Sequence, residues 1–169
     1  IEQAHLGRDV DRLRLKDGLL RANPLSFLRG TAFLFWDDWP GLSDADEGPA
    51  AWACGDLHAE NFGSFKGLNR LVYFDINDFD EACVAPCTWD ILRLITSVFV
   101  AAESLRLRQD FCCDLAVALA ETWRKELTTG KPRWIERKTA VGIIGALIDG
   151  LKDRRNAKFL DKRTVLRKG

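Results

Sequence analysis

Two polar segments, each at the end of a short apolar stretch, constrain the fold of this chain more than any other feature. The first, Gly55 to Phe62, follows the apolar residues 50–54, and the second, Phe74 to Asp80, ends an apolar run over 70–76. Short apolar runs bounded by turn-forming residues are typical of strands. The sequence therefore predicts a small β unit whose polar residues lie on loops, where a rigid scaffold commonly holds functional groups.

Helical patterns flank this β unit on both sides. Asn23-Pro24 ends the first of them, because a residue before proline avoids the helical region. Ser26 and Thr88 are candidate N-caps for two others. Helices are predicted over 3–22, 26–35, 88–99, 108–128 and 134–153, and loops over 37–49 and 83–87. The predicted fold class is α+β.

Composition excludes several function classes. Lys plus Arg equals Asp plus Glu, at 25 each, so no net charge attracts the chain to nucleic acid or to a membrane. No apolar run approaches the roughly 18 residues of a membrane span, and no signal peptide is recognisable. Five Cys, an odd number that includes the adjacent Cys112 and Cys113, indicate reduced thiols and a cytoplasmic location. Composition leaves the oligomeric state open.

The chain has 169 residues, which is the size of one ordinary domain. It contains no Met, not even at position 1. We therefore expect either a fragment of a longer protein or a sequence from which residues are missing.

The first polar segment holds an Asp and an Asn five residues apart, and a second Asp follows the Asn by seventeen residues. Phosphoryl-transfer enzymes use such a trio to position a hydroxyl nucleophile and to hold Mg²⁺, which prefers hard oxygen ligands. Asp56 is then the candidate for orienting or deprotonating the acceptor, and Asn61 and Asp78 are the candidate metal ligands. The alternative is a pair of simple turns, which Gly-Asp and Asn-Phe-Gly also suit.

The second polar segment is unusually acidic. Its carboxylates, Asp75, Asp78, Asp80 and Glu81, repel one another unless a cation or a base compensates them. An EF-hand loop does not fit, because apolar residues fall at the third ligand position. A solvated acidic turn remains the alternative. Arg29 is a candidate for binding phosphate or carboxylate, or else a helix-rim residue.

Cys54, His58, Cys83 and Cys87 have spacings that a zinc site permits. Each pair alone is a weak signal, and buried thiols without metal are the favoured interpretation. Cys54 and His58 also flank Asp56, so they are candidates for shaping its loop.

Gly55-Asp56-Leu57-His58-x-x-Asn61 resembles the catalytic loop of aminoglycoside phosphotransferases and related small-molecule kinases, which share the protein-kinase-like fold. In those enzymes an apolar strand ending I-D-W-x-D and then a helix opening with D-L follow the loop. Here Ile76 to Asp80 and Asp90-Ile91 take these places. The resemblance implies a protein-kinase-like fold, mainly its helical catalytic lobe, with a short β hairpin that carries the catalytic and metal loops. Cys54 departs from the pattern, because most of those kinases have His there.

A closer resemblance covers most of the chain, which is similar to the bacterial family called domain of unknown function 2252. The matching blocks are Pro24 to Thr31, Cys54 to Gly63, Phe74 to Glu81, Trp89 to Leu94 and Phe159 to Thr164. Members of that family are longer, and a Gly-rich segment and a Lys-bearing strand follow this region in them. The resemblance implies that residues 1–169 form a single kinase-like catalytic region, incomplete because the Gly-rich loop and the nucleotide-binding Lys are missing from it.

Together the two resemblances imply transfer of the ATP γ-phosphoryl group to a hydroxyl or amine of a small molecule, with Mg²⁺ as cofactor. The implied residues are Asp56 as the catalytic group, Asn61, Asp78 and Asp80 at the metal, and His58, Asp75, Asp90 and Arg29 in support. The expected partners are a nucleotide and an unidentified acceptor. Two alternatives stay open: a catalytically inactive kinase-like binding module, and a zinc-stabilised helical interaction domain.

Overall fold

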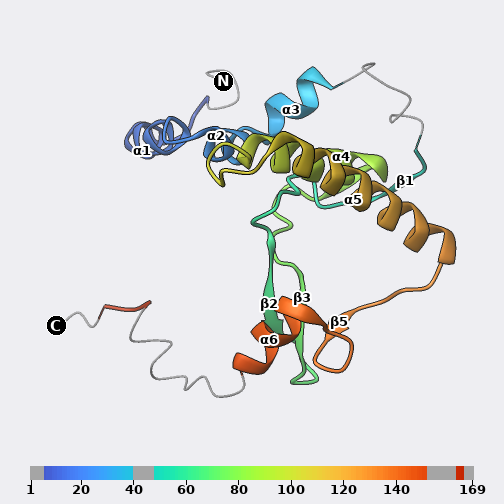
Figure 1. Ribbon diagram of the computed structural model, residues 1–169. Coiled ribbons are helices and arrows are strands. Elements are labelled where there is room, and N and C mark those ends of the chain that lie inside the picture. Colours follow the sequence, from blue (N-terminus) through green and yellow to red (C-terminus); the bar gives the residue numbers. More distant parts are fainter. Residues whose placement is uncertain (1–5, 40–47, 152–162, 166–169) are drawn as a thin grey trace. The chain divides into compact units, whose positions relative to one another are not determined.

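The computed structural model describes residues 6–39, 48–151 and 163–165 (Figure 1). In these ranges the chain forms six helices and two small antiparallel sheets, which confirms the α+β class. The contacts divide the chain into two compact units, residues 1–61 with 78–131 and residues 62–77 with 132–169. No helix within the described ranges combines the length and the apolar character that a bilayer crossing needs.

The first unit begins with helix α1, Val10–Leu20. Its N-cap is Asp9, whose side chain accepts a hydrogen bond from the backbone N–H of Arg12 at 2.9 Å. The helix predicted over 3–22 is therefore wrong over residues 6–9, which are not helical. Residues 3–5 lie outside the described ranges. A side chain that satisfies a free N–H group of the first turn sets the start of a helix more firmly than an apolar pattern does.

Helices α2, Pro24–Gly30, and α3, Ala32–Asp38, replace the single helix predicted over 26–35. Asn23 caps α2 by accepting from the backbone N–H of Ser26 at 2.8 Å, so Ser26 is not the cap. The break falls at Thr31, whose φ of −132° and ψ of 39° are not helical. Residues 40–47 of the predicted loop lie outside the described ranges.

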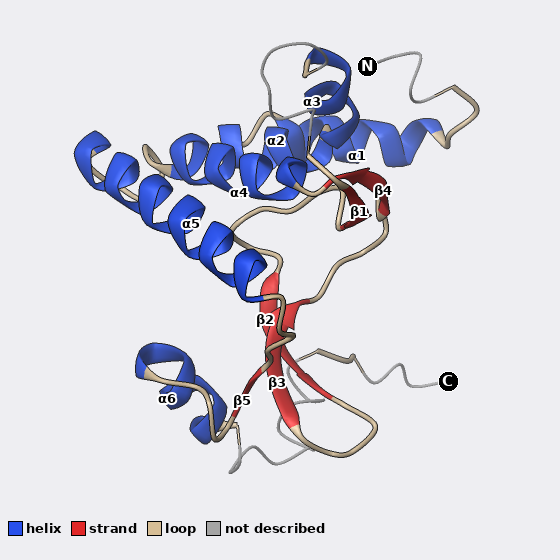
Figure 2. Cartoon of the chain, turned by 90° about the vertical axis from the view of Figure 1, so that its right-hand side faces the viewer, coloured by secondary structure: helices blue, strands red, loops and turns tan. Residues whose placement is uncertain are grey.

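Strands β1, Ala50–Ala53, and β4, Cys83–Pro86, pair antiparallel, with Ala53 opposite Cys83 (Figure 2). The strand predicted over 50–54 is confirmed, but the loop predicted over 83–87 is wrong. The segment 83–86 is extended because β1, far away in the sequence, supplies its hydrogen-bond partners. Pro86 is tolerated at the strand end, where a missing donor costs little.

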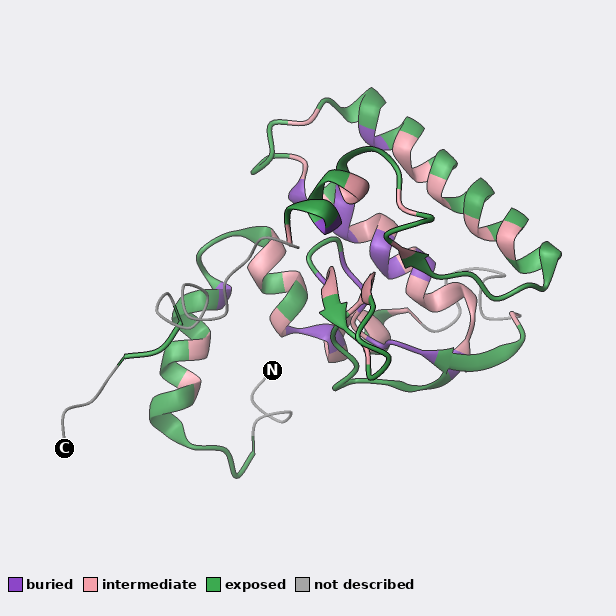
Figure 3. Ribbon diagram, turned by 90° about the horizontal axis from the view of Figure 1, so that it is seen from below, coloured by how far each residue is buried: buried purple, intermediate pink, exposed green. Residues whose placement is uncertain are grey.

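Helices α4, Thr88–Ala101, and α5, Gln109–Thr129, pack against each other and complete the first unit (Figure 2). α5 is exposed along most of its length, as Figure 3 shows in green. α4 supplies much of the core. The buried apolar residues of this unit are Leu20, Ala32, Ala53, Cys54, Leu57, Ala85, Ile91, Leu94, Val98, Ala101 and Cys112.

The described residues of the second unit form a three-stranded sheet of order β2-β3-β5 and one helix. Its elements are β2 (Phe62–Lys66), β3 (Val72–Ile76), β5 (Ile135–Glu136) and α6 (Gly142–Gly150). β2 and β3 form the predicted hairpin, which in sequence joins the two polar segments. The helix predicted from residue 134 is wrong at its start, because Ile135 pairs with Phe74 of β3 and α6 begins only at Gly142.

Candidate active site

Helix α4 fixes the backbone of the first polar segment. The Asp90 carboxylate accepts hydrogen bonds from the backbone N–H groups of Cys54, at 2.6 Å, and Gly55, at 3.1 Å. Gly55 has a φ of 87°, and a Cβ atom there would collide with the carbonyl oxygen of Glu81. Only glycine accepts both this conformation and this close approach, which explains why a glycine precedes Asp56.

Arg93, one turn beyond Asp90 on α4, holds the side chain of Asp56. Its Nε donates to Asp56 Oδ1 at 2.8 Å, and its Nη2 donates to the same oxygen and to the carbonyl of Leu28, the latter at 2.8 Å. Arg93 is completely buried, and its guanidinium lies 4.9 Å from the ring centroid of Phe35. Among the described residues, its Nη1 has no hydrogen-bond partner. Residues three apart lie on one helix face, so α4 fixes both the loop backbone and its carboxylate.

Sequence reasoning missed Arg93. The available signal was a charged residue within the apolar pattern of α4, three residues after the candidate Asp90. A buried arginine is rare unless it is paired, so a charged residue at this position indicates a buried acidic partner.

The environment of Asp56 raises the pKa of its carboxyl above the ordinary value. Burial is the main cause, and the hydrogen bond and charge of Arg93 act in the opposite direction. The side chain is still 14% exposed, so a ligand can reach it. A raised pKa makes this carboxylate a better proton acceptor than an ordinary Asp.

His58 is buried and neutral. Arg29 Nε donates to its Nε2 at 3.2 Å, and the backbone N–H of Glu60 faces its Nδ1 at the same distance. Burial first, and the Arg29 and Arg93 charges second, lower the pKa of His58 to about 4. Arg29 also forms an ion pair with Glu60. His58 therefore serves to orient Arg29 and the loop.

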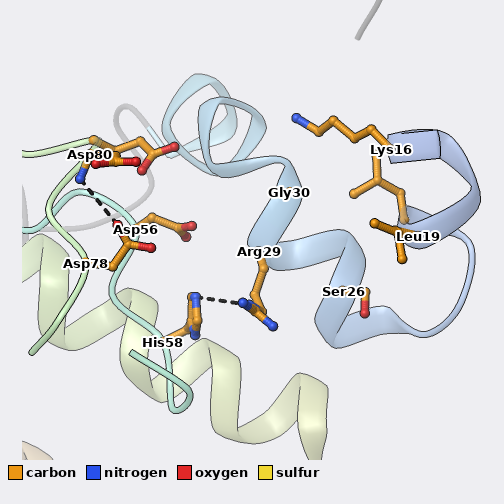
Figure 4. A pocket seen from close by; sticks show the side chains of 11 residues that line it. Lys16, Leu19, Ser26, Arg29, Gly30, Asp56, His58, Asp78 and Asp80 are labelled. Atoms are coloured by element: carbon orange, nitrogen blue, oxygen red, sulfur yellow. Dashed lines mark hydrogen bonds between the residues drawn. The ribbon is translucent and has the colours of Figure 1, made fainter. Parts of the chain in front are cut away.

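A cavity of about 380 Å³ opens beside this loop (Figure 4). Of the predicted site residues, five line it, namely Arg29, Asp56, His58, Asp78 and Asp80. Glu81 of the acidic segment also lines it, together with five residues that were not among the predicted site residues, namely Lys16, Leu19, Leu20, Ser26 and Gly30. All of these belong to the first unit.

The remaining predicted residues lie elsewhere. Asn61 is buried, and its Oδ1 accepts from the backbone N–H of His58 at 2.8 Å. Asp90 acts on the loop backbone, as described above. Asp75 lies on β3 of the second unit, where its carboxylate accepts from the N–H of Ile76. The structure thus brings the Asp56 and Asp78 carboxylates to one cavity, with Asn61 inside the loop.

The sequence pattern of a bacterial family, described as an uncharacterized protein conserved in bacteria (DUF2252), matches residues 8–168. The chain belongs to this family. No curated protein and no solved structure shows a significant match to it. The match spans both polar segments, the cavity and α4, so the site described here lies within the DUF2252 region. The family description states no reaction.

The donor chemistry of the DUF2252 cavity suits a magnesium ion. Asp78 and Asp80 both line the cavity, and the N–H of Asp80 lies 3.4 Å from Asp78 Oδ1. Among the described residues no three His, Cys, Asp or Glu side chains are grouped as a protein-only metal cage would require. Mg²⁺ seldom needs such a cage, because one or two carboxylates with substrate phosphates and water usually hold it. The metal role of Asn61 stays a prediction, since its oxygen already accepts a hydrogen bond.

The Cys54 thiol joins the two polar segments. It is buried and donates to the backbone carbonyl of Asp78 at 2.9 Å. Burial and then the Asp90 charge raise the pKa of Cys54 to about 11. Cys83, opposite Ala53 in the strand pair, is exposed, and both thiols are free. This DUF2252 chain therefore has a structural thiol directly before Gly55 and Asp56.

Proposed function

We propose that this protein is a kinase-like phosphotransferase that moves the γ-phosphoryl group of ATP to a hydroxyl or amine of a small molecule. The observation that carries the proposal is the shared cavity of Asp56, Asp78 and Asp80, with Asp56 held by Arg93 on a backbone fixed by Asp90. The protein-kinase-like fold is part of the proposal. Two observations support it: a β hairpin lies between the two acidic loops in sequence, and Asp90 of α4 accepts a hydrogen bond from the loop backbone.

Asp56 is the proposed proton acceptor. Arg93 occupies its Oδ1, which leaves Oδ2 for the acceptor group. As the acceptor oxygen or nitrogen bonds to the γ-phosphorus, the bond from that phosphorus to the bridging oxygen of ADP breaks, and the acceptor proton passes to Asp56. The raised pKa of Asp56 favours this proton transfer.

Asp78 and Asp80 would hold Mg²⁺. When bound, the ion would neutralise phosphate charge. A cavity of about 380 Å³ suits part of a small ligand, since ligand sites usually measure about 300–1,000 Å³. The chain's own contribution is positioning: Cys54 ties the Asp78 segment to the catalytic loop, and Asp90 holds that loop.

The second candidate is a binding module without catalysis. The ion pair of Asp56 with the fully buried Arg93 favours it, because a carboxylate committed to a permanent partner has a reduced tendency to accept a proton. In such a module the cavity would bind a nucleotide or another ligand, and no phosphoryl group would be transferred.

Calorimetry of the full-length protein with ATP and Mg²⁺, followed by assay of ADP formation with hydroxyl and amine compounds, tests the proposal. We expect Mg²⁺-dependent ATP binding that Asp78→Asn weakens. Asp114→Asn, at an exposed site on α5, is the matched control and should change nothing. ATP binding without ADP formation in the presence of any acceptor would favour the binding module. Absence of ATP binding would overturn the phosphotransferase and would leave only a module that binds another ligand.

A further inference from the structure

The cavity contains a cation that the sequence did not indicate. We propose that Lys16 of α1 binds a phosphate chain that enters the cavity together with a divalent cation. This inference rests on the proposed function and deepens it, because it places a phosphate-binding group for the candidate site within this chain. The resemblance to longer family members implied such a group beyond residues 1–169.

The position of Lys16 depends on Gly30. A Cβ atom at residue 30 would overlap Leu20 Cδ2 and would lie 3.6 Å from Lys16 Cε. The missing side chain therefore lets α1 approach α2 closely and lets the Lys16 stem lie across it. In Figure 4 the Lys16 side chain extends toward the side of the cavity that carries Asp78 and Asp80.

The other cations at this site already have partners. Arg29 is bound to Glu60 and His58, and Arg93 is bound to Asp56. Within the part of the chain that the structure describes, Lys16 makes neither a hydrogen bond nor an ion pair. It is the cavity's available ammonium group.

The unpaired carboxylates define what the ligand must carry. Asp78, Asp80 and Glu81 line the same cavity, and within the described ranges none of them is in an ion pair. These carboxylates would repel a phosphate that came alone, whereas a cation that came alone would leave Lys16 without a counter-ion. A phosphate chain bound to a divalent cation would give the carboxylates a positive partner and Lys16 a negative one. Lysine suits this role because its ammonium is a compact charge with three donors.

The experiment uses the full-length protein and Mg²⁺ with inorganic tripolyphosphate, which presents the phosphate chain of a nucleotide without its base and sugar. Calorimetry compares wild type, Lys16→Gln, Lys16→Arg and Arg14→Gln. Arg14 is the control, because it is exposed on another face of α1 and forms an ion pair with Asp11. A thermal melt of each variant shows that it folds.

We expect Lys16→Gln to weaken tripolyphosphate binding by about 10- to 100-fold, as loss of a charge-assisted hydrogen bond should. Lys16→Arg should retain most of the affinity, and Arg14→Gln all of it. Unchanged affinity in Lys16→Gln, or no binding by wild type, overturns the inference. ATP binding that needs Asp78 but not Lys16 would leave the proposed function intact, whereas Lys16-dependent binding without any phosphoryl transfer would leave the phosphate site intact and overturn the proposed function.

Discussion

Arg93 Nε donates to Asp56 Oδ1 at 2.8 Å, and this ion pair ties α4 to the candidate catalytic loop. The arginine is completely buried, and the carboxylate is 14% exposed. Because both charges are largely withdrawn from water, each is tolerated only in the presence of the other. The pair therefore couples the stability of the fold to the position of the carboxylate.

Arg93→Met should lower the free energy of unfolding by about 3–5 kcal/mol, since it leaves the Asp56 charge buried without its partner. Adding Asp56→Asn should recover part of that loss, with a coupling energy of about 0.5–3 kcal/mol. Urea unfolding of wild type, both single variants and the double variant completes the cycle. Strictly additive losses would contradict the coupling.

Asp56→Asn should reduce phosphoryl transfer by about 10²–10⁴-fold, the usual contribution of a positioned base. Its effect on Mg²⁺-ATP affinity should be small, because the proposed phosphate and metal contacts come from other residues. Asp78→Asn should weaken metal-dependent binding as well as turnover. Steady-state kinetics and calorimetry on the same preparations separate the two effects. Equal, small effects of both substitutions would favour the binding module.

His58 should make the fold sensitive to mild acid. Its pKa falls from 6.5 in the unfolded chain to about 4 in the native protein, so between these values the unfolded chain binds the extra proton. Protonation of His58 therefore does not affect the free energy of unfolding above about pH 6.5. Below that pH the free energy of unfolding falls progressively toward pH 4, by about 3 kcal/mol.

The check is denaturant unfolding of wild type and His58→Gln from pH 8 to pH 4. The free energy of unfolding of wild type should fall toward that of His58→Gln as the pH falls, because only wild type has the His58 side chain that protonation destabilises. The raised pKa of Asp56 acts in the opposite direction in both proteins and cancels in the comparison. A gap that stays constant with pH would show that His58 is not held neutral.

Cys54 should resist alkylation in the native protein. With its pKa raised to about 11, only about one thiol in a thousand is ionised at pH 8, and its side chain is buried. The exposed Cys83 and Cys113 should react first with iodoacetamide. Peptide mass spectrometry over a time course, with and without urea, gives the order of reaction. Early modification of Cys54 would argue against its buried hydrogen bond to Asp78.

A zinc chelator should leave the melting temperature unchanged, because Cys54 points to the Asp78 carbonyl and Cys83 is exposed on the strand pair. Metal analysis of the purified protein, with melting before and after chelation, tests this prediction. Stoichiometric zinc together with a large loss of stability on chelation would instead support the zinc-stabilised domain.

The sequence by itself determined the local features of this protein. The turn residues around Asp56 and Asp78, the β-prone run over 70–76 and the helical pattern after Thr88 depend on interactions between near neighbours. The structure has loops at the first two, a strand over 72–76 and a helix at the last. The hairpin between the two polar segments was implied by the resemblance, and its first strand, 62–66, was not predicted from the local pattern. Local chemistry was therefore enough to indicate which residues to consider as a site.

Only the tertiary structure decided how those residues are held. Arg93 meets Asp56 across 37 positions of sequence, and β4 becomes a strand because β1 pairs with it. Lys16 lines the cavity because the absence of a side chain at Gly30 lets α1 approach α2 closely. Such contacts join segments whose local patterns carry no information about each other. Their partners are set by which surfaces the whole chain can bury together, and a single sequence does not display that choice.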